Sequence, residues 1–154
     1  MAKLPQGYTD LLIELCEANV EFLLVGDRAV ILYGCDRATD DLDIFVRPTS
    51  ANSQRVFTAL EGFGAPLRTH AVTPKHFAVE GAAYRFLIAP LRIEVLTRIS
   101  GVSFDDALRG SKTFELHGRH IPYIGKPALI PNKKSAGCFK DLADVEDLEQ
   151  LDDG

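Results

Sequence analysis

This sequence of 154 residues contains no apolar run long enough to cross a bilayer as a helix, and its N-terminus lacks the basic-then-apolar pattern of a secretory signal. We therefore expect a cytoplasmic protein with no membrane partner. Cysteine is also scarce: Cys16, Cys35 and Cys138 are odd in number, far apart and without zinc-binding spacing. This pattern argues against a disulfide framework and against a structural zinc site.

A surplus of positive charge is missing as well. The chain has 17 Lys and Arg against 22 Asp and Glu, which gives a formal net charge of −5. This balance argues against strong non-specific binding of nucleic acid by the whole surface, although a local basic site remains compatible with it. Repeats, linkers and low-complexity segments are absent too, so we predict one domain over residues 1–154.

A pair of carboxylates stands out among the residues that are present. Asp41 and Asp43 lie two positions apart in an apolar, β-prone stretch that continues to residue 46. Successive side chains of a strand point to opposite faces, so both carboxylates point the same way. Two like charges on one half-buried face are unfavourable unless something neutralises them. A divalent cation such as Mg²⁺ does this and usually carries substrate phosphates; a solvated surface is the simpler alternative.

Two neighbouring segments favour the cation. The apolar residues 22–25 end at Gly26, and a short helical pattern follows over residues 27–33. A strand, a glycine turn and a helix N-terminus form a place where backbone N–H groups can hold phosphate. A third carboxylate, Glu94, interrupts the apolar residues 91–96, and its apolar neighbours Ile93 and Val95 face the other way. Glu94 therefore looks placed for a purpose.

The hydrophobic periodicity predicts an α+β fold, with a mixed β-sheet and helices mainly on one face. Predicted strands cover residues 22–25, 42–46, 76–79, 84–88, 91–96, 113–116 and 120–124, and predicted helices cover residues 9–18, 27–33, 50–62, 103–108, 126–136 and 140–151. The apolar face of the last helix could be core or the surface of a homodimer.

These motifs resemble the nucleotidyltransferase superfamily related to DNA polymerase beta. That superfamily has a strand-end hydrophobic-Gly-Gly/Ser motif, then Asp-hydrophobic-Asp/Glu after a helix, and an acidic residue on a later strand. The counterparts here are Val25-Gly26-Asp27, Asp41-Leu42-Asp43 and Ile93-Glu94-Val95. Residues 34–43, 96–104 and 132–144 also look like small stand-alone bacterial and archaeal members, some of toxin–antitoxin type. The resemblance spans about residues 11–151.

The resemblance implies a metal-dependent enzyme that transfers a nucleoside monophosphate from an NTP to an unknown hydroxyl acceptor. The acceptor could be a tRNA end, a protein or a small molecule. Asp41, Asp43 and Glu94 would be the catalytic residues and would bind two Mg²⁺ ions, with Glu94 as the best candidate for the base. The residues expected to contact the nucleotide are Gly26, Asp27, Arg37, Thr39, Lys133 and Lys140. Thr39 could instead only cap the turn before its strand, and Lys133 and Lys140 could instead lie on a solvated helix face.

Two departures from the family pattern favour a second hypothesis. Asp27 stands where the family has Gly or Ser, and its carboxylate would compete for the N–H groups that a triphosphate needs and would repel the nucleotide. Cys138 stands where related chains often have Arg. The alternative is therefore a degenerate, non-catalytic member that binds a nucleotide, a nucleic acid or a partner protein. We favour the enzyme because all three acids are present.

Overall fold

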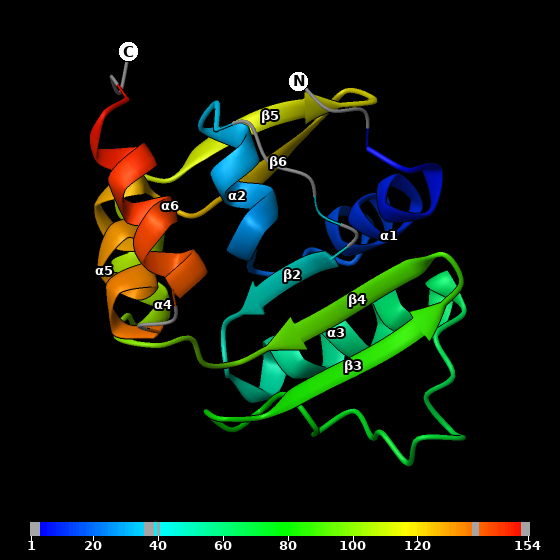
Figure 1. Cartoon of the computed structure of the whole chain (residues 1–154). Coiled ribbons are helices and arrows are strands. Elements are labelled where there is room, and N and C mark those ends of the chain that lie inside the picture. The colour runs from blue at the N-terminus through cyan, green and yellow to red at the C-terminus, as the bar shows by residue number, and fades with distance from the viewer. Residues whose placement is uncertain (1–3, 36–38, 40, 137–138, 152–154) are drawn as a thin grey trace.

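A six-stranded sheet organises the part of the chain that the computed structural model describes, which is residues 4–35, 39, 41–136 and 139–151 (Figure 1). The strands are β1 (Phe22–Val25), β2 (Asp41–Val46), β3 (Ala83–Ile88), β4 (Leu91–Leu96), β5 (Lys112–Leu116) and β6 (Arg119–Tyr123). The helices are α1 (Gln6–Glu17), α2 (Gly26–Leu32), α3 (Ser50–Phe63), α4 (Phe104–Leu108), α5 (Lys126–Ala136) and α6 (Phe139–Glu149).

The strands follow the order β3-β4-β2-β1-β6-β5. β2 runs parallel to β4 and antiparallel to β1, and β1 runs parallel to β6. The sheet is therefore mixed, and the α+β class predicted from the sequence is confirmed. In this order β2 lies between β1, which precedes Gly26, and β4, which carries Glu94. The candidate phosphate-binding turn and the third acid therefore lie on the two sides of β2.

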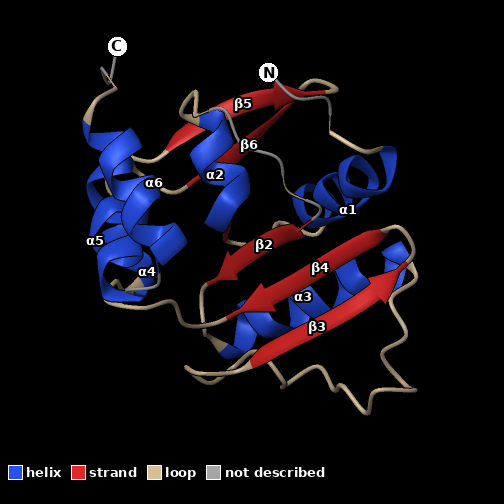
Figure 2. Cartoon of the chain, in the orientation of Figure 1, coloured by secondary structure: helices blue, strands red, loops and turns tan. Residues whose placement is uncertain are grey.

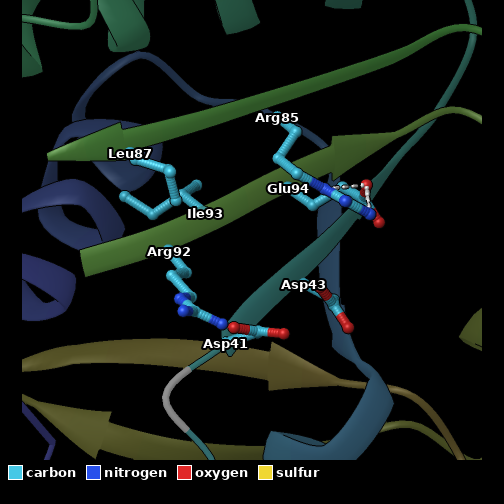
Figure 3. Close-up of a pocket in the computed structure, with 7 residues that line it drawn as sticks. All are labelled: Asp41, Asp43, Arg85, Leu87, Arg92, Ile93 and Glu94. Carbon is cyan, nitrogen blue, oxygen red and sulfur yellow. Dashed lines mark hydrogen bonds and ion pairs between the residues drawn. The ribbon is translucent and has the colours of Figure 1, made fainter. Parts of the chain in front are cut away.

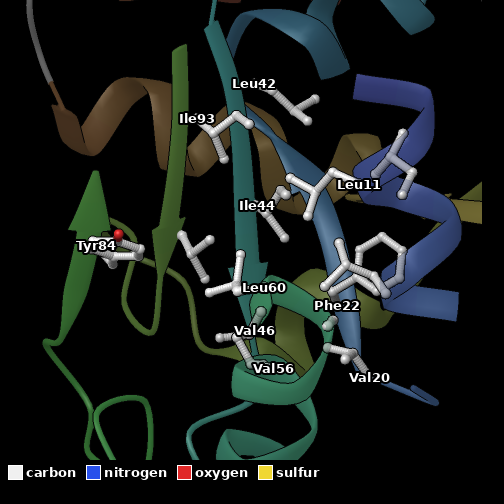
Figure 4. Packing of buried hydrophobic residues seen from close by; sticks show 14 of the residues in the cluster. Leu11, Val20, Phe22, Leu42, Ile44, Val46, Val56, Leu60, Tyr84 and Ile93 are labelled. Atoms are coloured by element: carbon white, nitrogen blue, oxygen red, sulfur yellow. The ribbon is translucent and has the colours of Figure 1, made fainter. Parts of the chain in front are cut away.

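Two hydrophobic clusters pack on the two faces of the sheet. Alternate residues of β2, Leu42 and Ile44, belong to the first cluster with α1 and α3, which are the two longest helices (Figure 4). Phe45 points to the other face and packs in the second cluster with residues of α2, α4, α5 and α6. Helices were expected mainly on one face, and the structure distributes them over both.

The second face stays open over β3 and β4, where α3 lies behind the strands in the view of Figure 2. On this open face the side chain of Arg85 is 73% exposed and Leu87 is 65% exposed. The inward-facing Phe86 between them is 2% exposed. A half-covered sheet of this kind leaves a platform on which polar side chains can meet a ligand.

The predicted strand over residues 76–79 is wrong, because this segment forms turns. The Ser53 side chain of α3 makes hydrogen bonds to the backbone of this loop, in place of those that a neighbouring strand would make. The Ser53 hydroxyl accepts a hydrogen bond from the Phe77 amide at 2.9 Å and donates to the carbonyl of Pro74 at 2.8 Å. Phe77 is fully buried, so its apolar character reflects packing under the loop and not a strand.

The C-terminal helix uses its apolar face for the core. Leu148 is 0% exposed and belongs to the second cluster. Val145 on the same helix is also buried. This packing decides between core and dimer surface for these two side chains. Among the described residues, none of the helices has the length and hydrophobicity that spanning a membrane requires.

Candidate functional site

The three predicted acids meet on the open face of the sheet, where three strands present alternate side chains side by side. The strand register places Arg85, Glu94 and Asp43 in one row across β3, β4 and β2. It places Leu87, Arg92 and Asp41 in the next row. Neighbouring strands lie about 4.8 Å apart and alternate residues of a strand about 6.7 Å apart, so these six positions form a compact patch.

The patch surrounds a cleft of about 340 Å³, which we call the acidic cleft (Figure 3). Its lining residues are Asp41, Asp43, Arg85, Leu87, Arg92, Ile93 and Glu94. The same alternation explains its origin: Leu42 and Ile44 lie in the core, so Asp41 and Asp43, which alternate with them, point to the open face. The prediction that Asp41 and Asp43 point the same way is therefore confirmed, and Glu94 lines the same cleft.

Asp43 is the most perturbed group of the cleft. Burial raises its pKa, and the carboxylates of Glu94, Asp41 and Asp27 raise it further, to about 6. Lys133 opposes this effect. A carboxylate surrounded by other carboxylates lacks positive charge, and a divalent cation with oxygen ligands would supply it. The donor chemistry at Asp41 and Asp43 therefore fits a hard cation such as Mg²⁺.

Glu94 already has a cationic partner. Arg85 Nε donates a hydrogen bond to Glu94 Oε2 at 2.9 Å across the β3–β4 pair, and Arg85 Nη2 forms an ion pair with the same oxygen at 2.7 Å (Figure 3). The Glu94 side chain is 22% exposed, whereas Arg85 reaches out of the cleft. Among the residues that the structure describes, no three His, Cys, Asp or Glu side chains are close enough together to hold one metal ion. The three acids thus share a cleft without converging on one point.

Gly26 brings the backbone of the first turn of α2 against Asp43. Its φ is +68°, in the left-handed region that glycine adopts easily. A Cβ at this position would collide with Asp43 Oδ2. Gly26 is therefore required both by its conformation and by the close approach to the carboxylate, and the strand–glycine–helix turn predicted from the sequence is confirmed.

Asp27 and Lys133 meet beside the cleft. Lys133 Nζ of α5 lies 3.4 Å from Asp27 Oδ1 and 3.1 Å from Asp144 Oδ2 of α6. The side chains of Lys133 and Asp144 are 7% and 0% exposed. The lysine that was expected at the nucleotide is therefore held in a buried group with two carboxylates, and one of these is the residue that departs from the family motif.

The other predicted nucleotide contacts divide into two groups. Thr39 Oγ1 accepts a hydrogen bond from the Asp41 amide at 2.8 Å, which is the turn-capping role considered as its alternative. Arg37, Cys138 and the side chain of Lys140 lie outside the part of the chain that the structure describes.

Sequence reasoning missed Arg85, Arg92 and Asp144. Arg85 and Arg92 carried a signal, because each lies on a predicted strand at a position that alternates with buried residues. Whether their side chains lie on the same face as the three acids depends on how the strands pair. Asp144 carried no such signal, because it lies in an acidic helix where a carboxylate usually faces water.

Two solved structures share this fold. TM1012, a candidate nucleotidyltransferase from Thermotoga maritima, is 15% identical, with a TM-score of 0.57 over 94% of this chain and 87% of that one. An antigenic nucleotidyltransferase-like protein from Paracoccidioides brasiliensis is 16% identical, with a TM-score of 0.52 over 92% of this chain and 71% of that one. No protein-family profile and no curated protein matches the sequence.

The chain therefore shares its fold with these two nucleotidyltransferase-like structures. Identity of 15–16% establishes the fold alone.

Proposed function

We propose that this protein is a metal-dependent nucleotidyltransferase that transfers a nucleoside monophosphate from an NTP to a hydroxyl acceptor. One observation carries the proposal: Asp41, Asp43 and Glu94 share the open face of the sheet beside the Gly26 turn. The crowding that raises the pKa of Asp43 to about 6 supports the presence of a cation during function. Asp41 and Asp43 would hold Mg²⁺, which would neutralise phosphate charge and stabilise the leaving pyrophosphate.

The strand order supports an arrangement in which the leaving group and the acceptor lie on opposite sides of the acids. Gly26 follows β1 on one side of the acids, and β4 and β3 lie on the other side. In an in-line displacement the nucleophile and the leaving group occupy opposite sides of the phosphorus atom. The pyrophosphate would therefore lie over Gly26, and the acceptor hydroxyl would enter over β4.

The bonds follow from this placement. The acceptor oxygen forms a bond to the α-phosphorus while the bond from that phosphorus to the bridging oxygen breaks, and pyrophosphate leaves. Glu94 Oε1, the oxygen that does not face Arg85, would accept the proton of the acceptor hydroxyl. The acceptor, whether an RNA end, a protein or a small molecule, must carry a hydroxyl group that reaches this oxygen.

One observation favours a second candidate function, a non-catalytic module that binds a nucleotide or a partner. Lys133, one of the residues expected to contact phosphate, is paired with Asp27 and Asp144. A triphosphate would have to displace the Asp27 carboxylate or leave this lysine unused. Either requirement weakens nucleotide binding and therefore counts against the enzyme.

Calorimetric titration with each NTP, with and without Mg²⁺, tests the proposal before the acceptor is known. We expect Mg²⁺-dependent binding that is lost in Asp41→Asn/Asp43→Asn. The matched control is Glu61→Gln/Glu115→Gln, which removes two exposed carboxylates elsewhere on the surface and should bind as the wild type does. Equal binding by the acidic-cleft variant, or no binding of any NTP by the wild type, would refute the proposal.

A further inference from the structure

The contact between Arg85 and Glu94 changes what the acidic cleft can bind. One guanidinium nitrogen donates a hydrogen bond to Glu94 Oε2 at 2.9 Å, and a second lies 2.7 Å from the same oxygen in an ion pair. Charge-assisted hydrogen bonds of this kind are among the stronger polar contacts of proteins. Glu94 Oε2 therefore has a cation beside it before any ion arrives, and its lone pairs are directed at Arg85.

The rows of the sheet explain why Arg85 occupies this place. Arg85, Glu94 and Asp43 follow one another directly across β3, β4 and β2. A cation shared by Glu94 and Asp43 would have to lie above this row, beside the guanidinium. Like charges repel at such short range, so an ion and the paired guanidinium disfavour each other there. Asp41 and Asp43 lie one strand further away, and their carboxylates make no hydrogen bond or ion pair with the residues that the structure describes.

We propose that Arg85 replaces a second metal ion in this protein: the chain binds one divalent cation at Asp41 and Asp43, and the guanidinium supplies the positive charge at Glu94. The inference rests on the proposed function and deepens it. It differs from the expectation of two Mg²⁺ ions that the family resemblance implied. It agrees with the finding that no three acidic, His or Cys side chains converge among the described residues.

Arg92 provides the matched comparison. It lines the same cleft, lies opposite Asp41 in the next row and has the same charge. Its side chain makes no hydrogen bond or ion pair with the residues that the structure describes. Removing Arg92 therefore changes the charge of the cleft without releasing Glu94, whereas removing Arg85 does both.

Direct counting of bound Mn²⁺ tests the inference without any assay of transfer. Paramagnetic resonance of the free ion in a titration gives the number of sites per chain. We expect one site in the wild type, one in Arg92→Gln and two in Arg85→Gln. The double variant Arg85→Gln/Glu94→Gln should return to one site, because the second ion needs the carboxylate that Arg85 released. Glu94→Gln alone should keep the first site.

Every other pattern overturns the inference. Two ions in the wild type would show that Arg85 does not occupy a metal position, while the proposed function would stand. One ion in both the wild type and Arg85→Gln would show that something else limits the site. A second site in Arg92→Gln would show that the number of bound ions depends only on the net charge of the cleft. If no variant binds Mn²⁺, the inference fails, and the separate NTP titration decides whether the proposed function fails with it.

Discussion

Replacing Asp43 by Asn should stabilise this protein at neutral pH, although Asp43 is a proposed metal ligand. The carboxylate is partly buried next to Glu94 and Asp41, and these surroundings disfavour its charged form. Asn has nearly the same shape and no charge. The substitution therefore removes an unfavourable charge from the folded state and leaves the packing of β2 almost unchanged.

The pKa of Asp43 gives the magnitude. It rises from an ordinary 3.8 to about 6 in the folded chain, so the folded state holds the proton more tightly than the unfolded state does. The stability of the wild type therefore falls as the pH rises from about 4 to about 6, and stays lower above that. At 1.36 kcal/mol per pKa unit, Asp43→Asn should gain about 1 kcal/mol at pH 4.5 and about 3 kcal/mol at pH 7.5.

Urea denaturation at these two pH values measures the difference. Glu115→Gln removes an exposed carboxylate and should change stability by less than about 0.5 kcal/mol at both. Mg²⁺ should reduce the gap at pH 7.5, because the ion binds the folded wild type and stabilises it, whereas the variant has lost a ligand. A destabilising effect of Asp43→Asn, or a gain of the same size at both pH values, would show that the carboxylate is not crowded by its neighbours.

Three further substitutions test the surroundings of the cleft. Gly26→Ala should destabilise the fold by at least about 1–2 kcal/mol in urea, because the backbone φ of +68° is left-handed and the new methyl group meets Asp43. An unchanged midpoint of urea denaturation would contradict the close approach. Lys133→Met should lower the free energy of unfolding by about 3–5 kcal/mol, because Asp144 keeps a buried charge without this partner. Adding Asp144→Asn should recover part of this loss, and no recovery would argue against the pairing. Asp27→Asn should tighten Mg²⁺–NTP binding in calorimetry by about tenfold, which is about 1.4 kcal/mol; unchanged binding would show that Asp27 does not obstruct the nucleotide.

The sequence was sufficient to find the acids of the cleft because alternation decides the face of a strand. Asp41 and Asp43 alternate with buried apolar residues, and so does Glu94, so all three had to leave the core. The glycine turn was equally readable, since Gly26 ends an apolar strand directly before a helix. These signals are local, and local patterns survive without knowledge of the partner strand.

The partners of these residues were not readable, because they depend on long-range pairing. The contact between Arg85 and Glu94 follows from the register of the β3–β4 pair, and the neighbourhood of Glu94 and Asp43 follows from the parallel pairing of β2 with β4. Asp144 is buried against Lys133 of another helix. No pattern within a single segment encodes such a contact.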